Sequence, residues 1–325
     1  MARIFNDGGE LGDMLFWSAY TGSITSTEKR SGTYSYTNNN NENTKNIPNL
    51  SEFYLRVGFK RASTGFTVSW YNLTSNLGYI TVNGISYCEA YVNGSKVSTG
   101  SGLVSLADWN LLELRFLLSD TGIIQTKLNG VSDINYSGDT RPSSYTYIDN
   151  LHFGAAGSTT VYTDDYALND TTGTVDNSWC GDGHYEFLVA NAEGDTLQWT
   201  PSSGGVHYAM VDDVPSDGDT TYITTSGTGL RDMFNLASFT DTNKTILRIF
   251  PEGRAKDAQA IASEIKLGIK TNGTVYLGSG IVLSSVYSKV VGSDYFTYPA
   301  SGTIWTKDVI DSIQFVTERE NSVVS

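Results

Sequence analysis

Short runs of alternating apolar and polar residues, separated by tight-turn signals, recur through the first half of this 325-residue chain. Leu112, Leu114 and Phe116 alternate with Glu113 and Arg115, which is the period of a half-buried β-strand. Strand-sized runs arrive about every 8 to 12 residues, and several end at Asn-Gly, the strongest short hairpin signal. This spacing predicts an antiparallel sandwich or barrel rather than a parallel sheet covered by helices.

Length and composition agree with that prediction. A chain of 325 residues favours two domains. Its 20 Tyr, 13 Phe and 33 Gly suit short aromatic strands joined by tight turns. We therefore predict an all-β protein of two jelly-roll-like β-sandwich domains in tandem, the first over residues 1–170 and the second over residues 171–325.

Charge and terminal sequence remove several function classes. The net charge of -14, without a long run of Lys or Arg, argues against nucleic acid as a partner. No apolar run of about 18 residues is present, so we expect no membrane span. The N-terminus lacks the pattern of a signal peptide, and Cys88 and Cys180 have neither metal-ligand nor disulfide-framework spacing. We expect free thiols and a reducing cytoplasm.

Three local predictions concern less regular segments. The polar tract Asn38 to Asn46 has nothing to bury and is expected to be an exposed loop. Residues 256–267 contain good helix formers, yet the later apolar residues alternate, which favours a strand. Near the C-terminus, Thr306 is expected to cap a short helix over 307–312 before a final strand over 313–317.

A named resemblance rests on motifs in a fixed order. In the first half these are Trp109, Glu113, Leu114 and Phe116, then Leu128-Asn129-Gly130, Tyr147-Ile148-Asp149-Asn150-Leu151, and Tyr162 to Asp165. Together they resemble the concanavalin A-like jelly roll of the LamG and pentraxin kind, over roughly residues 1 to 170. The second half carries Asp170-Thr171-Thr172-Gly173, Trp199-Thr200-Pro201, His207-Tyr208, and Pro299, Gly302, Trp305 and Thr306. With these, the whole chain resembles a group of tailed-bacteriophage virion proteins in which a jelly roll precedes a second β domain.

The motifs for catalysis are not found in the sequence. Glucanases of this fold carry two carboxylates on one strand as E-x-D-x-E, whereas Glu113 stands alone and is expected at the solvent face or rim. The three histidines, His152, His184 and His207, match no nucleophile motif and are expected to be structural. We therefore expect no enzymatic activity.

Two candidate binding sites remain. Asp164, Asp165 and Asp170 offer hard oxygen ligands suited to Ca²⁺, and some jelly rolls of the resembled superfamily hold calcium at the sandwich rim. The other interpretation is an ordinary polar strand end. Tyr136, Tyr145 and Tyr147 lie near predicted loops, where aromatic rings could stack on sugars.

The sequence as a whole suggests a non-catalytic virion structural protein of a tailed phage, a tail, baseplate, fibre or capsid-decoration subunit assembled in the bacterial host cytoplasm. Its expected partners are other virion proteins and copies of itself, in closed rings or trimers. The alternative is a carbohydrate-binding adhesion module that recognises host surface glycans. A glycoside hydrolase is the third and weakest hypothesis.

Overall fold

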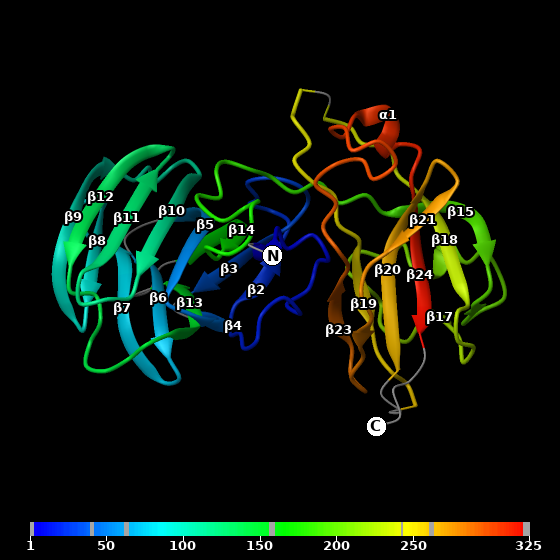
Figure 1. The fold of residues 1–325 in the computed structure, drawn as a ribbon, viewed down its shortest axis with the longest axis horizontal. Coiled ribbons are helices and arrows are strands. Elements are labelled where there is room, and N and C mark those ends of the chain that lie inside the picture. The colour runs from blue at the N-terminus through cyan, green and yellow to red at the C-terminus, as the bar shows by residue number, and fades with distance from the viewer. Residues whose placement is uncertain are drawn as a thin grey trace. The chain divides into compact units, whose positions relative to one another are not determined.

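The computed structural model describes residues 3–39, 42–61, 65–155, 160–241, 243–259 and 263–320. The chain divides into two compact units, Met1–Glu186 and Phe187–Ser325 (Figure 1). Both consist almost entirely of antiparallel strands, which confirms the predicted all-β class and tandem β-sandwich organisation. Among the described residues, no helix has the length and apolar character needed to cross a membrane.

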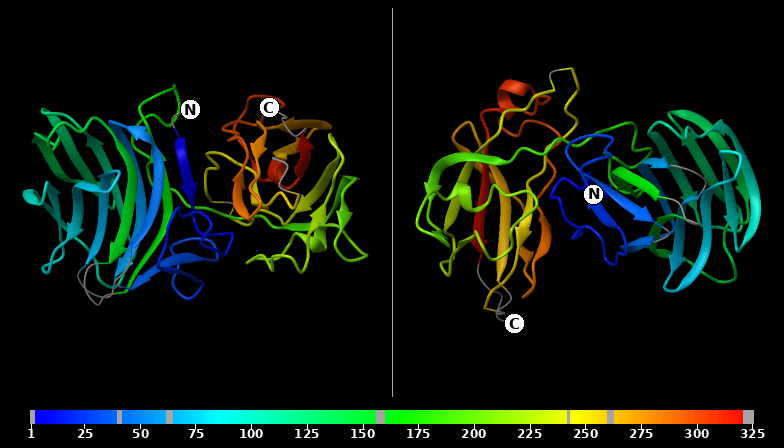
Figure 2. Two further views of the ribbon diagram at one scale, coloured as in Figure 1. Left: turned by 90° about the horizontal axis from the view of Figure 1, so that it is seen from below. Right: turned by 180° about the vertical axis from the view of Figure 1, so that it is seen from behind.

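The first unit is built from two antiparallel sheets. An eight-stranded sheet has the order β12-β11-β10-β5-β14-β3-β2, with β1 paired to β14. Its strands are β1 (Arg3–Asp7), β2 (Ser23–Thr25), β3 (Ser35–Asn39), β5 (Glu52–Arg61), β10 (Asn110–Leu117), β11 (Gly122–Leu128), β12 (Val131–Gly138) and β14 (Thr160–Asn169). A six-stranded sheet has the order β4-β13-β6-β7-β8-β9. Its strands are β4 (Glu42–Leu50), β6 (Phe66–Asn72), β7 (Ser75–Val82), β8 (Tyr87–Val92), β9 (Ser95–Leu103) and β13 (Ile148–Ala155). Figure 2 shows these strands as two curved layers.

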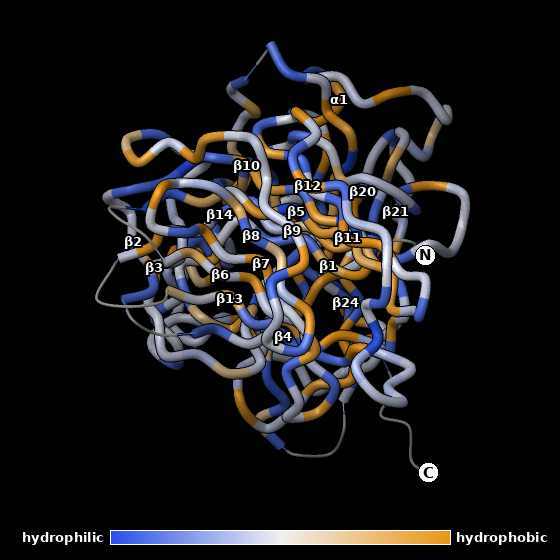
Figure 3. The backbone as a smooth tube through the Cα atoms, turned by 90° about the vertical axis from the view of Figure 1, so that its left-hand side faces the viewer, coloured by the Kyte–Doolittle hydropathy of each residue, from blue (hydrophilic) through white to orange (hydrophobic). Residues whose placement is uncertain are grey.

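Alternation along the strands generates the core of this unit. Leu114 of β10 pairs with Leu55 of β5, and both side chains are buried, whereas the next pair, Arg115 and Tyr54, points to the opposite face. Buried residues of both sheets form one continuous hydrophobic cluster, so the sheets pack face to face. Hydrophobic and hydrophilic residues alternate along many of these strands in Figure 3. The predicted jelly-roll sandwich is therefore present.

The predicted polar loop over residues 38–46 is wrong where the structure describes it. Asn38 lies in β3 and Asn43 in β4, and both are fully buried. The Asn38 amide donates to the Phe153 carbonyl, while the Asn43 side-chain oxygen accepts the backbone N–H groups of Thr21 and Gly22. These bonds satisfy one end of each buried amide, while Asn38 Oδ1 and Asn43 Nδ2 have no hydrogen-bond partner among the described residues.

The second unit has a six-stranded antiparallel sheet of order β15-β18-β24-β20-β21, with β22 paired to β20, and two separate strand pairs, β16-β17 and β19-β23. Its strands are β15 (Ala190–Leu197), β16 (Thr200–Pro201), β17 (Ile223–Thr224), β18 (Arg231–Leu236), β19 (Glu252–Ala255), β20 (Glu264–Thr271), β21 (Thr274–Leu277), β22 (Ile281–Val282), β23 (Ser288–Val291) and β24 (Gln314–Glu320). Two small clusters provide its core, one around Trp305 and Ile310, the other around Leu267 and Val290.

The less regular segments of this unit differ in part from prediction. A strand does form late in the predicted range 256–267, but β20 begins only at Glu264, and residues 260–262 lie outside the described residues. The short helix α1 (Lys307–Ile310) is present, although the Thr306 side chain makes no capping hydrogen bond. The apolar run 245–250 forms only an isolated bridge from Ile249 to Tyr295.

Candidate functional site

The outer face of the eight-stranded sheet, which points away from the core, carries a row of polar side chains. Strand pairing aligns one residue from each of five neighbouring strands, Asn169, Tyr54, Arg115, Gln125 and Asn135. Exposure rises along this row. Asn169 is 0% and Tyr54 8% exposed, Arg115 and Gln125 are half-buried, and Asn135 is exposed. The row therefore begins under cover at β14 and opens at the sheet edge, β12.

The buried end of the row is covered by a later segment of the same chain. Residues 176–186, here called the cover segment, contain no helix or strand and cross the outer face of the sheet. The Ser178 carbonyl accepts from Asn169 at 2.7 Å, and the Trp179 ring packs edge-on against Tyr54 with centroids 5.7 Å apart. The Gly181 N–H donates to Glu113 Oε1 at 2.8 Å. The segment thus satisfies polar groups of the sheet that would otherwise face solvent.

Two arginines hold the cover segment from the sheet side. Arg56, only 4% exposed, donates to the carbonyl of Gly181 at 3.2 Å and to that of Asp165 at 2.9 Å. Arg30 forms ion pairs of 2.5 Å with both Asp165 and Asp182 and donates to the carbonyl of Gly183. Guanidinium groups suit this role because they present several donors in a fixed plane.

A bulge in β14 positions Asp165 between the two arginines. The pairing of β14 with β5 shifts register between Asp164 and Ala167, and Asp165 takes a positive φ of 52°. Asp adopts this left-handed conformation more readily than most residues. The bulge places the Asp165 carboxylate against Arg30 and the Asp165 carbonyl against Arg56.

The two adjacent acids of this bulge have opposite pKa shifts. Burial and the negative charge of Asp165 raise the pKa of Asp164 well above its ordinary value, although three backbone N–H groups oppose this. Burial also acts to raise the pKa of Asp165, but the His184 hydrogen bond and the Arg30 charge outweigh it and lower that pKa. Asp165 is therefore the ionised member of the pair, and it forms the ion pair with Arg30, which holds the cover segment.

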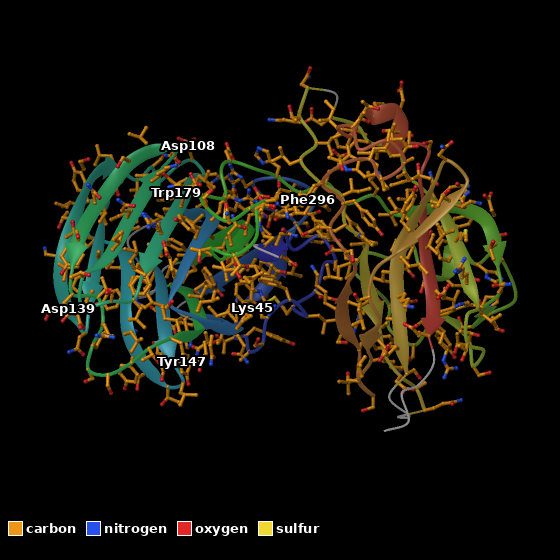
Figure 4. All side chains as sticks on the ribbon, viewed as in Figure 1. Lys45, Asp108, Asp139, Tyr147, Trp179 and Phe296 are labelled. Atoms are coloured by element: carbon orange, nitrogen blue, oxygen red, sulfur yellow. The ribbon has the colours of Figure 1, made fainter. Side chains whose placement is uncertain are left out.

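The open half of the outer face lies over β10, β11 and β12. Gln125 donates to Asn135 at 2.8 Å and accepts from Arg115 at 3.4 Å, so the row is linked by hydrogen bonds. Trp179 stands where the cover ends, with the Lys127 ammonium 4.2 Å from its ring centroid. In Figure 4, Trp179 is labelled near the top of the first unit. An indole beside amide and guanidinium groups matches what a sugar requires, namely a flat apolar surface and hydrogen-bonding partners.

Each of the three predicted calcium ligands already accepts hydrogen bonds from other groups of the protein. Asp165 is taken by Arg30 and Ser31, Asp164 by the backbone N–H groups of Arg30 and Ser31, and Asp170 by the N–H and hydroxyl of Thr172. No group of three or more His, Cys, Asp or Glu side chains within the described ranges is arranged to hold a metal ion. These residues do not fit a calcium site as they stand.

The three predicted glycan-contacting tyrosines lie apart from the polar row. Tyr136 pairs with buried Ile124 and packs against the core, and Tyr145, which also packs there, donates to the Ser75 hydroxyl. Tyr147 is half-buried and is labelled near the bottom of the first unit in Figure 4. None of the three therefore belongs to the row of polar side chains that Trp179 borders.

The sequence analysis placed Glu113 at the solvent face or rim, and this prediction is wrong. Glu113 is 3% exposed and lies beneath Gly181. The expectation failed because alternation shows which face a residue takes, not what later covers that face. The histidines make structural contacts: His152 stacks on Tyr71, His207 bonds Asp232 at 2.7 Å, and His184 lies 3.5 Å from Asp165. Sequence reasoning missed Arg30, Arg56 and Trp179: Arg56 is placed by the register of β5, whereas Arg30 and Trp179 lie in irregular segments that give no periodic signal.

The motif residues of the second unit serve its packing. The Trp305 indole is 3% exposed and donates to the Tyr295 carbonyl at 2.8 Å, and the Trp199 indole donates to the Leu230 carbonyl at 2.9 Å. Asp232, fully buried, accepts from the Trp199 backbone and from His207. These residues hold the unit together and do not form an open site.

Comparisons with known proteins complete the description. No family model matches the chain, and no curated protein matches it. Among solved structures, an endo-β-1,4-glucuronan lyase from the fungus Trichoderma reesei is similar over 55% of this chain and 100% of its own, with 14% identity and a TM-score of 0.44. The alginate lyase Aly36B aligns over 51% of this chain and 96% of its own, with 11% identity and a TM-score of 0.36. The exoplasmic/lumenal domain of VIP36 in its Ca²⁺/Man3GlcNAc-bound form aligns over 50% and 86%, with 14% identity and a TM-score of 0.34.

One expectation needs correction in view of these structures. The prediction that the chain is not an enzyme is overturned, because two of the three are polysaccharide lyases. The absence of the glucanase motif ruled out one mechanism, and it was wrong to extend that result to catalysis in general.

Proposed function

We propose that the first unit binds glycans on the open half of the outer face of its eight-stranded sheet. The observation that carries this proposal is the hydrogen-bonded row Arg115, Gln125 and Asn135. Arg115 is oriented by an ion pair with Glu52 at 2.8 Å, and the next residue of the row, Tyr54, packs against the Trp179 indole. Amide and guanidinium groups in a plane can bond the hydroxyls of a sugar, while the indole covers an apolar ring face. The six-stranded sheet turns its inner face to the same core, so the two outer faces are the surfaces left for binding.

A glycan array probed with the full chain, followed by calorimetric titration of the best hits, tests this proposal. Arg115→Ala should weaken binding about tenfold or more, because a hydrogen bond to a charged group is worth about 1.5 to 3 kcal/mol. Arg141→Ala is the matched control, since that arginine pairs with exposed Asp120 outside the row. Equal affinities for the two variants would contradict the assignment. Chromatography of each glycan after incubation measures cleavage in the same samples.

We also propose that the chain works in the particle of a tailed bacteriophage, as a tail, baseplate, fibre or capsid-decoration subunit assembled in the host cytoplasm. The order of short motifs along both halves of the sequence supports this proposal. In the second unit two of those motifs, at Trp199 and Trp305, coincide with residues that stabilise the fold. Bound to a particle, the glycan site would contact host surface sugars. Mass spectrometry of purified particles should detect the chain in stoichiometric amounts, and light scattering should show oligomers of it.

A further inference from the structure

We infer that the glycan site is short and recognises the end of a glycan, not the interior of a long chain. This inference rests on the glycan-binding proposal and adds its ligand class. It follows from three features of the outer face: a fixed cover, a boundary at Trp179, and apolar residues beside the row.

The cover segment is held too firmly to act as a movable lid. Its anchors are themselves buried: Arg56 is 4% exposed, and the Asp165 side chain paired with Arg30 is 0% exposed. Tyr185 adds a further bond, donating to the Tyr166 carbonyl at 2.9 Å. Gly183 permits the close approach, because a Cβ at this position would lie 2.4 Å from Arg56. The covered half of the row is therefore unavailable to a ligand.

Trp179 marks the boundary in both rows of the outer face. In the first row it packs on Tyr54, next to Arg115. In the second row Arg56, Glu113 and Lys127 are aligned; Glu113 is buried, and the Lys127 ammonium lies 4.2 Å from the centroid of the indole ring. A ligand that follows the first row from the exposed edge strand β12 therefore crosses β12, β11 and β10 before it meets the indole packed on Tyr54.

On β10 and β11 the open polar groups run across the strands and not along them, whereas the edge strand β12 also carries exposed Ser132 and Ser137. On β11, Ile123 lies on one side of Gln125, and Lys127, beneath the indole, lies on the other. On β10, Leu117 lies beyond Arg115. Three adjacent strands span two gaps, roughly 10 Å in all, since neighbouring strands are about 4.8 Å apart. That distance accommodates about two sugar rings, the last of them against Trp179.

The test is a length series with the full chain. Cello-oligosaccharides and oligoglucuronates of one to six residues are titrated by calorimetry, followed by the corresponding long polymers. We expect affinity to rise from one to two residues and then to stay within about twofold, with one protein bound per polymer chain. A steady gain through six residues, or several proteins per chain, would overturn the inference while leaving glycan binding intact. Binding of neither series, together with an empty array, would instead refute the proposed function.

Two variants locate the boundary. Trp179→Ala should weaken disaccharide binding about tenfold, since stacking and burial of the ring are lost, and circular dichroism checks the fold. Tyr147→Ala is the control, because this half-buried tyrosine lies outside the polar row. If Tyr147→Ala weakened binding and Trp179→Ala did not, the site would lie elsewhere and the inference would be wrong.

Discussion

Replacing Arg30 by methionine tests whether the buried ion pairs hold the cover segment in place. The substitution removes the partner of Asp165, whose carboxylate is completely buried, and also the anchors of Asp182 and Gly183. Breaking one partner of a buried pair costs about 3 to 5 kcal/mol. Asp165 keeps the Ser31 hydroxyl at 2.7 Å, so we expect the lower end, about 3 kcal/mol. For a unit of this size that corresponds to a fall in Tm of about 6 to 12 °C.

Calorimetry measures the fall, and hydrogen exchange assigns it to the first unit, because peptides over 176–186 should lose protection first. Arg141→Met, which breaks the exposed pair with Asp120, should leave Tm unchanged. Adding Asp165→Asn to Arg30→Met should recover part of the loss, since the uncompensated buried charge is removed. If Arg30→Met behaves like Arg141→Met, or if Asp165→Asn gives no recovery, the ion pairs do not anchor the segment.

The remaining predictions concern pH, thiols and calcium. Burial raises the pKa of Glu10 from 4.5 to about 7, so the folded state binds a proton that the unfolded state has lost between these pH values. The free energy of unfolding should therefore fall as pH rises from 4.5 to about 7, by up to about 1.4 kcal/mol per pH unit. Urea titrations of Glu10→Gln should not show this dependence. Burial raises the pKa of Cys88 to about 12 and of Cys180 to about 11, so a thiol reagent at pH 8 should label neither until urea is added. A calcium chelator should leave Tm and glycan binding unchanged, because the oxygens of Asp164 and Asp165 already accept protein donors; a shift in either would contradict this.

The all-β class was predictable because the alternation of apolar and polar residues within a strand shows which side chains are buried. The alternation of Leu112, Leu114 and Phe116 states which side faces the core, and all three are at most 1% exposed. Asn38 and Asn43 were misassigned for the opposite reason: their hydrogen bonds come from distant segments, and local composition carries no trace of them.

The candidate site was less predictable than the fold. Arg115, Gln125 and Asn135 follow one another at intervals of 10 residues, whereas Tyr54 is distant in the sequence, and only the register of β5, β10, β11 and β12 aligns the four. Trp179 lies in an irregular segment with no periodic signal. Calcium binding was predicted from acidic residues that lie close together in the sequence. Asp165 instead pairs with Arg30, and no local sequence pattern connects these two residues.

The cover segment also determines how this protein can be shortened or recombined. A fragment ending at residue 170, after β14, would lose the groups bonded to Arg56 and Glu113 and would expose two charges that are now buried. Residues 171–186 therefore belong to the folding unit that precedes them, although the sequence analysis assigned them to the second domain. In any natural exchange of the second unit between related genes, the crossover that leaves a stable first unit lies after residue 186.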